Sequence, residues 1–487
     1  MKAAILAEKP NWSAIRIATR MPSCSAILTF IALAGSVVPP AIAFSATDPF
    51  NTEALAPPRP LLFPAADRAD LPCRAVAAAT IYGVLEVVDL ALCQNPRTHE
   101  GWANARAQAA LVGLAQSEFL PALDGSATVE RIHSNGQNAS ANSAALTLSW
   151  LLYDFGARSA NLENARQLLS AANASLDSTV QSVFIDALQS YYNTQAARAA
   201  VTAALESEKA SRASLAAAEV RYQVGTGTPA DRLLAQTAWS QATLNRIRAE
   251  GVVQNAFGTL ANVMGLDAST PLTLADIPEV LPDETFERDI NALIAQARER
   301  RPDLKAAEAQ ERAARASVDL ARANGLPTLS LGTGPSWFGG TGDTIGSHGN
   351  SIGLTLTLPL FSGFSTTYNV RSAQARVDVA GAQRENIRLQ VALDVWTAYQ
   401  SLITATQTIR TTADLLASAE QSENVALGRY KAGVGSILDV LNAQSALAAA
   451  RLQRIQAKLD WNVFRATLAK ALGALDSGLL NPAVRTP

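Results

Sequence analysis

The stretch RYKAGVGSILDVLNAQ, Arg429 to Gln444, is a helical pattern that stops at a short glycine-rich break and restarts at once. The stretch RYQVGTGTPADRLLAQ, Arg221 to Gln236, shows the same break 208 residues earlier. That offset also pairs residues 146–265 with residues 354–473 at many matched positions. A repeat of this length predicts one architecture used twice within the 487 residues, rather than a set of unrelated domains.

Both breaks carry the residues of a tight turn between two helices. A glycine can adopt the left-handed backbone conformation that ends a helix, and a small hydroxyl residue can cap the next helix. An acid then follows at the third helical position, where the positive end of the helix dipole favours it. These residues are Gly225, Thr228 and Asp231 in the first stretch and Gly433, Ser436 and Asp439 in the second.

The segments that precede the breaks are very long helical patterns. Residues 157–222 contain no Pro or Gly, and residues 367–430 are interrupted only by Gly381 and Gly428. Each helix would extend about 95–100 Å, so neighbouring helices must cover it along its length. Shorter helices are expected at 84–117 and 229–263 beside the first long helix, and at 289–323 and 437–472 beside the second.

Alternating apolar and polar residues predict two β-hairpins, with strands of about 9–11 residues that suit a tilted membrane strand. The strands fall within 119–132, 143–153, 326–338 and 351–361. In the last of them, one face holds Leu354, Leu356, Leu358 and Leu360. Half-buried strands of a soluble sheet would alternate in the same way. Four strands cannot close a membrane barrel, for which about eight is the smallest number, so a barrel needs several chains.

The N-terminal part of the chain predicts export. Residues 1–43 combine basic residues, an apolar run and the small-x-small motif Ala41-Ile42-Ala43, which is typical of a cleaved secretory signal. Residues 44–82 are Pro-rich and predict an extended, mobile lead-in. Cleavage leaves Cys73 and Cys93 in an oxidising compartment, which predicts one disulfide between them, with two free buried thiols as the alternative.

Composition and motifs exclude several classes of function. The 40 basic and 42 acidic residues are interspersed, so no surface is expected that would bind nucleic acid. The three histidines are His99, His133 and His348, and two of them lie near the expected hairpin loops, so exposed polar residues are expected there rather than ligands or bases. The run GGTGDTIG does not lie between a strand and a helix, as a nucleotide-binding loop requires. The sequence therefore predicts no catalysis, no cofactor and no metal site.

The signal peptide, the duplicated hairpins and the tip sequence YKAGVGSILDVLNAQ together closely resemble the TolC family of outer-membrane channel-tunnels, with a lean to its type I secretion (CyaE-like) branch. The resemblance implies an α+β membrane protein of the Gram-negative outer membrane, internally duplicated. Three chains with four strands each would form a twelve-stranded β-barrel, continued by a long periplasmic α-helical barrel. The two repeats would span 83–265 and 289–475, separated by residues 266–288 and followed by a tail, 476–487.

The resemblance also implies roles for the two turns. A periplasmic adaptor would dock on the helical tips, at Val224, Gly225, Thr226, Gly227, Ala432, Gly433, Val434 and Gly435. The candidates for a periplasmic gate are Tyr222, Asp231, Arg232, Tyr430, Asp439 and Asn442. Gly435 and Asn442 stand where a basic residue and a second acid can occur in the family, so a dense salt-bridge network is not implied. Helix capping alone is an equal alternative for Asp231 and Asp439.

The function implied by the resemblance is a passive exit duct that works with a periplasmic adaptor and an inner-membrane pump. Type I secretion of a polypeptide such as a toxin, driven by an ABC-type exporter, is the preferred hypothesis, because the long lead-in and the paired cysteines look like those of secretion-type members. Small-molecule efflux with a proton-driven pump is the alternative. A soluble periplasmic coiled-coil scaffold or adaptor is an alternative of another class, but it leaves the β-hairpins without a role.

Overall fold

The computed structural model describes residues 48–58, 80–134, 137–276, 289–340 and 347–475. It divides into two compact units, Met1–Pro49 and Phe50–Pro487, and the second contains all the helices and strands described below. The same succession of two short helices, two strands and two long helices occurs twice along this unit. The predicted signal peptide and the C-terminal tail lie outside the described residues.

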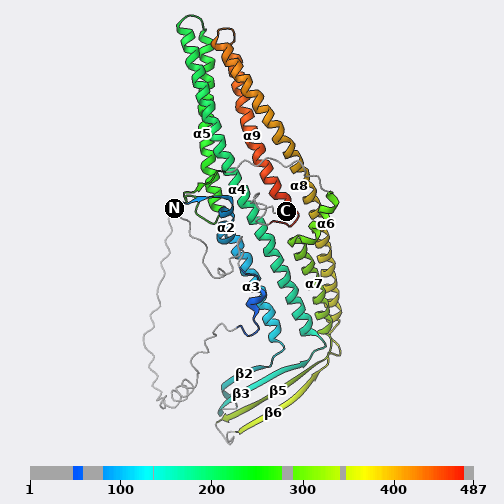
Figure 1. The fold of residues 1–487 in the computed structure, drawn as a ribbon. Helices are drawn as coiled ribbons and strands as arrows, with labels where there is room; N and C mark the ends of the chain where they lie inside the picture. The colour runs from blue at the N-terminus through cyan, green and yellow to red at the C-terminus, as the bar shows by residue number, and fades with distance from the viewer. Residues whose placement is uncertain (1–47, 59–79, 135–136, 277–288, 341–346, 476–487) are drawn as a thin grey trace, which may run out of the picture. The chain divides into compact units, whose positions relative to one another are not determined.

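Four long helices form most of the fold. They are α4 (Ala157–Gln223), α5 (Pro229–Val263), α8 (Ser365–Lys431) and α9 (Ile437–Ala471). α4 and α8 have 67 residues each, and α5 and α9 have 35 each, so the predicted long helices are confirmed. α4 packs against α5 and α8 against α9, while α4 also packs against α9 (Figure 1).

The helices that precede the strands are broken, which corrects the prediction of single helices over 84–117 and 289–323. The structure has α2 (Val84–Gln94) and α3 (Pro96–Ser117) in the first repeat. It has α6 (Ile290–Arg300) and α7 (Pro302–Ala323) in the second. The residue before each proline is extended, because the proline ring excludes the helical conformation there. α7 packs against α4 as well as α8, so the two repeats share an interface.

Each break between short helices rests on a glycine at the end of a returning long helix. Gly265, after α5, has φ +75°, and a Cβ there would lie 2.5 Å from the carbonyl oxygen of Gln94. Asn95 Nδ2 donates to the carbonyl oxygen of Val263 at 2.9 Å, which fixes the same contact. Gly473, after α9, has φ +67°, and a Cβ there would lie 3.0 Å from the carbonyl carbon of Arg300. The breaks therefore set how the short helices meet the long ones.

Replacing Gly265 by alanine is expected to lower the free energy of unfolding by about 2–4 kcal/mol, from the left-handed conformation and the overlap with the Gln94 backbone. Gly251→Ala is the control, because Gly251 lies inside α5 and a Cβ placed there has no atom within 4 Å. That control should gain about 0.5–1 kcal/mol from helix propensity. Chemical denaturation followed by circular dichroism measures both, and equal effects of the two changes would contradict the contact.

The four strands of the two repeats form one antiparallel sheet in the order β2-β3-β5-β6. Their bounds are β2 (Ala122–Ser134), β3 (Gln137–Tyr153), β5 (Thr328–Gly340) and β6 (Ser347–Thr357). Figure 1 shows the sheet at one end of α4 and α8, with the two helical turns at the other end. β2 and β6 are the outer strands, and among the described strands of the chain each is paired on one side only.

The predicted hairpins are confirmed, but the strand lengths of 9–11 residues are wrong for three of the four. The strands contain 13, 17, 13 and 11 residues. β6 ends at Thr357, so Leu358 and Leu360 lie beyond it, because Pro359 has no N–H group to continue a ladder. β3 begins earlier than predicted, since its polar residues from Gln137 to Asn142 still pair with β2.

The largest apolar core surrounds the middle of α4. Leu188, Leu260 and Met264 are fully buried there. They pack beside the short parallel strands β1 (Ile81–Tyr82) and β4 (Thr273–Leu274). The Tyr191 hydroxyl donates to the carbonyl oxygen of Ala275 at 3.0 Å, so α4 anchors the start of the inter-repeat segment. Residues 277–288 of that segment lie outside the described residues.

The prediction of an extended, mobile lead-in is wrong for residues 50–58, which pack on α3. Residues Thr52–Leu55 form a short 3-10 helix, η1, and Thr52 fits against Gly113, where no side chain competes for space. Glu53 pairs with Arg106 at 2.7 Å. The Trp102 Nε1 group donates to the carbonyl oxygen of Pro57 at 3.1 Å. Gly113, Arg106 and Trp102 of α3 thus provide a packing surface for residues 50–58 that composition alone did not indicate.

Cys93 is disulfide-bonded. Its predicted partner, Cys73, lies outside the described residues, so the pairing stays a prediction. Across the described parts of the chain, the helices lack the apolar length needed to cross a membrane.

Candidate functional site: the two helical turns

Both turns end their long helix in the same way. Gly225 has φ +77° and Gly433 has φ +84°, which confirms the predicted left-handed glycines. Thr226 N donates to the carbonyl oxygen of Arg221 at 2.9 Å, and Val434 N to that of Arg429 at 3.0 Å. These bonds reach back five residues and satisfy carbonyls that the helix end would otherwise leave exposed.

A second glycine in each turn is required by space. A Cβ at Gly227 would lie 3.0 Å from the backbone nitrogen of Tyr222, and one at Gly435 would lie 3.0 Å from that of Tyr430. The chain must pass this close to its own helix in order to turn back within a few residues. The predicted docking positions Gly227 and Gly435 therefore have a structural role, whatever binds beside them.

The following helices begin with complete capping boxes. Asp231 N donates to Thr228 Oγ1 at 3.1 Å, and Thr228 N donates to Asp231 Oδ2 at 3.1 Å. The matched bonds in the second turn, between Asp439 and Ser436, are 3.1 and 3.2 Å. The capping role of both acids is thus confirmed, and a gate role for them stays a prediction.

Removing the cap hydroxyl and removing the charge should separate these two roles. Ser436→Ala should weaken the start of α9 by about 1 kcal/mol, seen as faster amide hydrogen exchange at residues 437–441. Asp439→Asn keeps an oxygen acceptor but loses the charge. A gate function predicts that Asp439→Asn raises single-channel conductance while Ser436→Ala leaves it unchanged. Equal conductance in both variants and the parent would leave Asp439 as a cap only.

The two predicted gate tyrosines occupy different environments. Tyr222 is 41% exposed, and the Arg232 guanidinium lies over its ring at 5.2 Å. Tyr430 is 4% exposed and packs between the two helical hairpins. Burial raises the pKa of Tyr430, although nearby Arg221 acts against that shift. Within the single chain Tyr430 is a core residue, and its role as a gate residue stays a prediction.

Arg221 links the two turns and was missed by sequence reasoning. Its guanidinium lies over the Tyr430 ring at 4.6 Å and donates to the Tyr430 carbonyl oxygen at 3.1 Å. In the second repeat the position matched to Arg221 is also an arginine, Arg429. The sequence alone therefore does not show which of the two arginines contacts the other turn. Below this contact, Gln444 Nε2 donates to Ser214 Oγ at 3.0 Å, and Arg451 pairs with Glu206 at 3.1 Å. Polar contacts therefore join α4 to the second hairpin.

The outer surface of the turns is apolar and exposed. Val224 is 66% exposed and Val434 is 69% exposed. Thr226 and Ala432 beside them are also exposed. On α9, Asp439 and Asn442 both face solvent in the single chain. Apart from Gly227 and Gly435, which are half-buried, the predicted docking residues thus form two small exposed patches, one on each turn.

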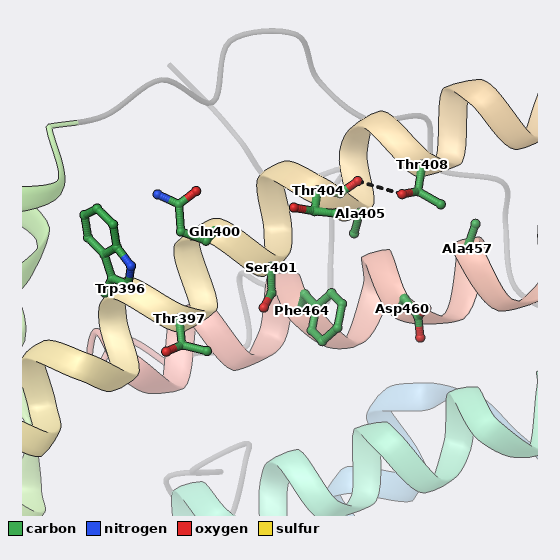
Figure 2. A pocket seen from close by; sticks show the side chains of 10 residues that line it. All are labelled: Trp396, Thr397, Gln400, Ser401, Thr404, Ala405, Thr408, Ala457, Asp460 and Phe464. Carbon is green, nitrogen blue, oxygen red and sulfur yellow. Dashed lines mark hydrogen bonds between the residues drawn. The ribbon is translucent and has the colours of Figure 1, made fainter.

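A pocket between α8 and α9, shown in Figure 2, is lined mainly by hydroxyl, amide and aromatic side chains. Its one acidic side chain, Asp460, accepts a hydrogen bond from Gln456 at 2.7 Å. The lining offers no set of acid, base and nucleophile. Within the described residues no group of three or more His, Cys, Asp or Glu side chains is placed to hold a metal ion.

Comparison with known proteins covers both repeats. The sequence model of the family described as "Outer membrane efflux protein" matches residues 87–266 and 293–474. Protein CyaE of Bordetella pertussis is 33% identical over 384 residues, which is 76% of this chain and 80% of that protein. Outer membrane protein TolC of Escherichia coli is 24% identical over 424 residues, 83% of this chain and 85% of that one.

Solved structures share the fold. The Campylobacter jejuni CmeC outer membrane channel superposes with a TM-score of 0.73 at 21% identity, covering 80% of this chain and 85% of that one. The open state of the Neisseria gonorrhoeae MtrE outer membrane channel gives a TM-score of 0.68 at 22% identity, with coverage of 81% and 89%.

Proposed function

Because the chain belongs to the outer membrane efflux protein family, the TolC family, we propose that it is the exit duct of a tripartite export system. The chain is an outer-membrane channel protein with a large periplasmic helical part. The family match sets aside a soluble periplasmic scaffold. The observation that carries the proposal is that the match covers both repeats, 87–266 and 293–474.

The proposed assembly contains three chains. One chain supplies four strands whose outer members, β2 and β6, have a free edge. Free edges are satisfied when the sheet closes with copies of itself, and three copies give twelve strands, enough for a membrane barrel. The helices of the same three chains then surround a continuous periplasmic tunnel. This duct is passive, and the energy for transport comes from the inner-membrane pump.

The proposed passenger is a polypeptide, such as a toxin, delivered by an ABC-type exporter. Two features support type I secretion over small-molecule efflux: the identity to Protein CyaE is 33%, against 24% to TolC, and residues 50–58 of the lead-in pack on α3. Multidrug efflux remains the second candidate, since the chain is also 27% identical to outer membrane protein OprJ of Pseudomonas aeruginosa.

The test is a reconstitution in a Gram-negative strain that lacks its own exit duct. The chain is expressed with an ABC-type exporter, a periplasmic adaptor and the polypeptide that this exporter carries, and the medium is assayed for that polypeptide. Secretion that depends on this chain supports the proposal. Efflux of dyes or drugs without polypeptide in the medium would replace it with the multidrug function. Recovery of the chain after a urea wash in the soluble fraction would contradict both.

Docking of the adaptor at the turns can be tested by introducing a charged side chain into an exposed turn. Val434→Asp should abolish export, because it places a carboxylate in the exposed apolar patch on the second turn, while Val434→Thr keeps the shape and should retain export. Cross-linking to the adaptor measures docking directly. Both variants should still reach the outer membrane, since the side chain is 69% exposed and supports no core.

A further inference from the structure

The pairing register divides the sheet into two chemically different faces. Residues that stand directly opposite in antiparallel strands share a face, so the register assigns every second residue of each strand. On one face Leu123 pairs with Leu148, and Leu331 pairs with both Trp150 and Leu354. We call this the apolar face. The other, called the hydrophilic face, holds pairs such as Thr147 with Asp124 and Ser330 with Thr355.

The apolar face carries a band of large exposed side chains. They include Leu123, Val129, Leu146, Trp337, Ile352 and Leu354, which are 44–82% exposed in the single chain. Most polar residues of this face, such as Arg131 and His348, lie toward the hairpin turns, while Thr333 lies within the band, opposite Leu148 and Ile352. A band of this kind, alternating with small hydrophilic residues, is typical of the lipid-facing side of a membrane barrel. Under the proposed function the hydrophilic face therefore lines the conduit.

The charged side chains of the hydrophilic face in the described strands are all negative. The described residues of the four strands contain three side chains that are charged at neutral pH: Asp124, Glu130 and Arg131. Asp124 pairs with Thr147 and Glu130 with Ala141, which places both carboxylates on the hydrophilic face. Arg131 pairs with Ser140 on the apolar face. Within the described strands, the hydrophilic face thus bears two negative charges and no positive one.

The Asp124 and Glu130 carboxylates lie at different heights along the strand direction of the sheet. They are six residues apart on β2, which corresponds to about 20 Å along the strand. Both are exposed, and most of their neighbours on that face are Gly, Ala, Ser or Thr, which neither neutralise nor cover them. A separation of about 20 Å exceeds the Debye length of about 10 Å at 0.1 M salt, so the two levels act independently.

We propose that the outer-membrane section of the conduit selects for cationic passengers, with Asp124 and Glu130 as the selectivity-determining residues. The proposal rests on the proposed function, because it needs several chains to close the sheet around a pore. With three chains, each carboxylate forms a ring of three negative charges, one ring near each end of the apolar band. Such rings raise the local concentration of cations and exclude anions over distances set by the salt.

Reversal potentials of the full-length protein in planar bilayers test this proposal. Under a potassium chloride gradient at neutral pH, the parent protein should be cation-selective. The double variant Asp124→Asn/Glu130→Gln should lower the cation-to-anion permeability ratio about twofold or more, and Asp124→Lys/Glu130→Lys should move it further toward anions. The difference between parent and variants should shrink at about 1 M salt, where the Debye length is about 3 Å.

Arg131→Gln is the matched control, because it changes a charge next to Glu130 on the opposite face. It should leave the permeability ratio unchanged. All variants are first checked for urea-resistant recovery from the outer membrane, so that folding defects are seen separately. A ratio that stays at the parent value in both double variants would overturn the inference while leaving the duct intact. Failure of the parent protein to conduct would overturn the proposed duct itself.

Discussion

Replacing Asp154 by alanine is expected to lower the free energy of unfolding by about 3–5 kcal/mol, because it leaves Arg158, whose side chain is 11% exposed, without its counter-charge. Asp154 lies between β3 and α4 and is 6% exposed. Its Oδ2 accepts hydrogen bonds from the Arg158 Nε group at 3.0 Å and the Arg158 backbone N–H at 2.8 Å. The Arg158 guanidinium also lies over the Phe119 ring at 4.9 Å. The pair therefore holds the sheet onto the first long helix.

The pH dependence of this pair has a definite sign. Burial by itself raises the pKa of Asp154, but the hydrogen bonds from Arg158 and Gly156 outweigh it and hold the pKa below the ordinary value of 3.8. A carboxyl group with a lowered folded-state pKa stabilises the fold above its unfolded pKa, and that contribution is lost as the pH falls through the folded value. Between pH 5 and 8 the stabilisation by this pair should therefore stay constant, and it should weaken only below about pH 4.

The second repeat provides the control for Asp154. The matched residues there are Ser362 and Thr366, whose hydroxyl groups lie 3.4 Å apart at an exposed site. Ser362→Ala should change the free energy of unfolding in detergent by less than about 0.5 kcal/mol. Asp154→Ala combined with Arg158→Met should recover part of the loss, because no unpaired charge remains. Equal losses for Asp154→Ala and Ser362→Ala would contradict the role assigned to the buried pair.

The long elements could be predicted from the sequence because their signals are repeated and local. Two 67-residue helices without proline, each followed by a glycine turn and a capping box, leave few alternatives. The helix breaks at Pro96 and Pro302 carried a clear signal as well, since a proline biases the preceding residue away from the helix. The helical pattern on both sides of each proline nevertheless favours one continuous helix, so the sequence analysis predicts a single helix at each place.

Other features depend on contacts between segments far apart in the chain. Residues 50–58 pack on α3 through contacts with Gly113 and Trp102. Nothing in the sequence around these two residues indicates which distant residues they contact. The burial of Tyr430 arises only when α4 and the second hairpin meet through Arg221. At the turns, sequence therefore predicts the local caps correctly, while the environment of each tyrosine is decided by packing between the repeats.

Replacing Gly334 by alanine is expected to abolish urea-resistant recovery from the outer membrane, because it forces apart the two strands through which the repeats join. A Cβ at Gly334 would lie 1.8 Å from the carbonyl oxygen of Leu146 and 3.2 Å from the Thr147 Cα. These are backbone atoms of β3, and pairs on both sides, Ala145 with Ser336 and Leu148 with Thr333, fix them in place. The overlap should cost about 3 kcal/mol or more.

Gly332→Ala tests whether the effect belongs to this contact or to any side chain at a glycine of β5. Gly332 lies two residues away on the same strand and the same face, and nothing lies within 4 Å of a Cβ placed there. The Gly332 variant should fractionate like the parent protein, while the Gly334 variant should be released by urea or degraded. Since β3 belongs to the first repeat and β5 to the second, loss at Gly334 alone would mean that the sheet forms only when the two repeats join at full register.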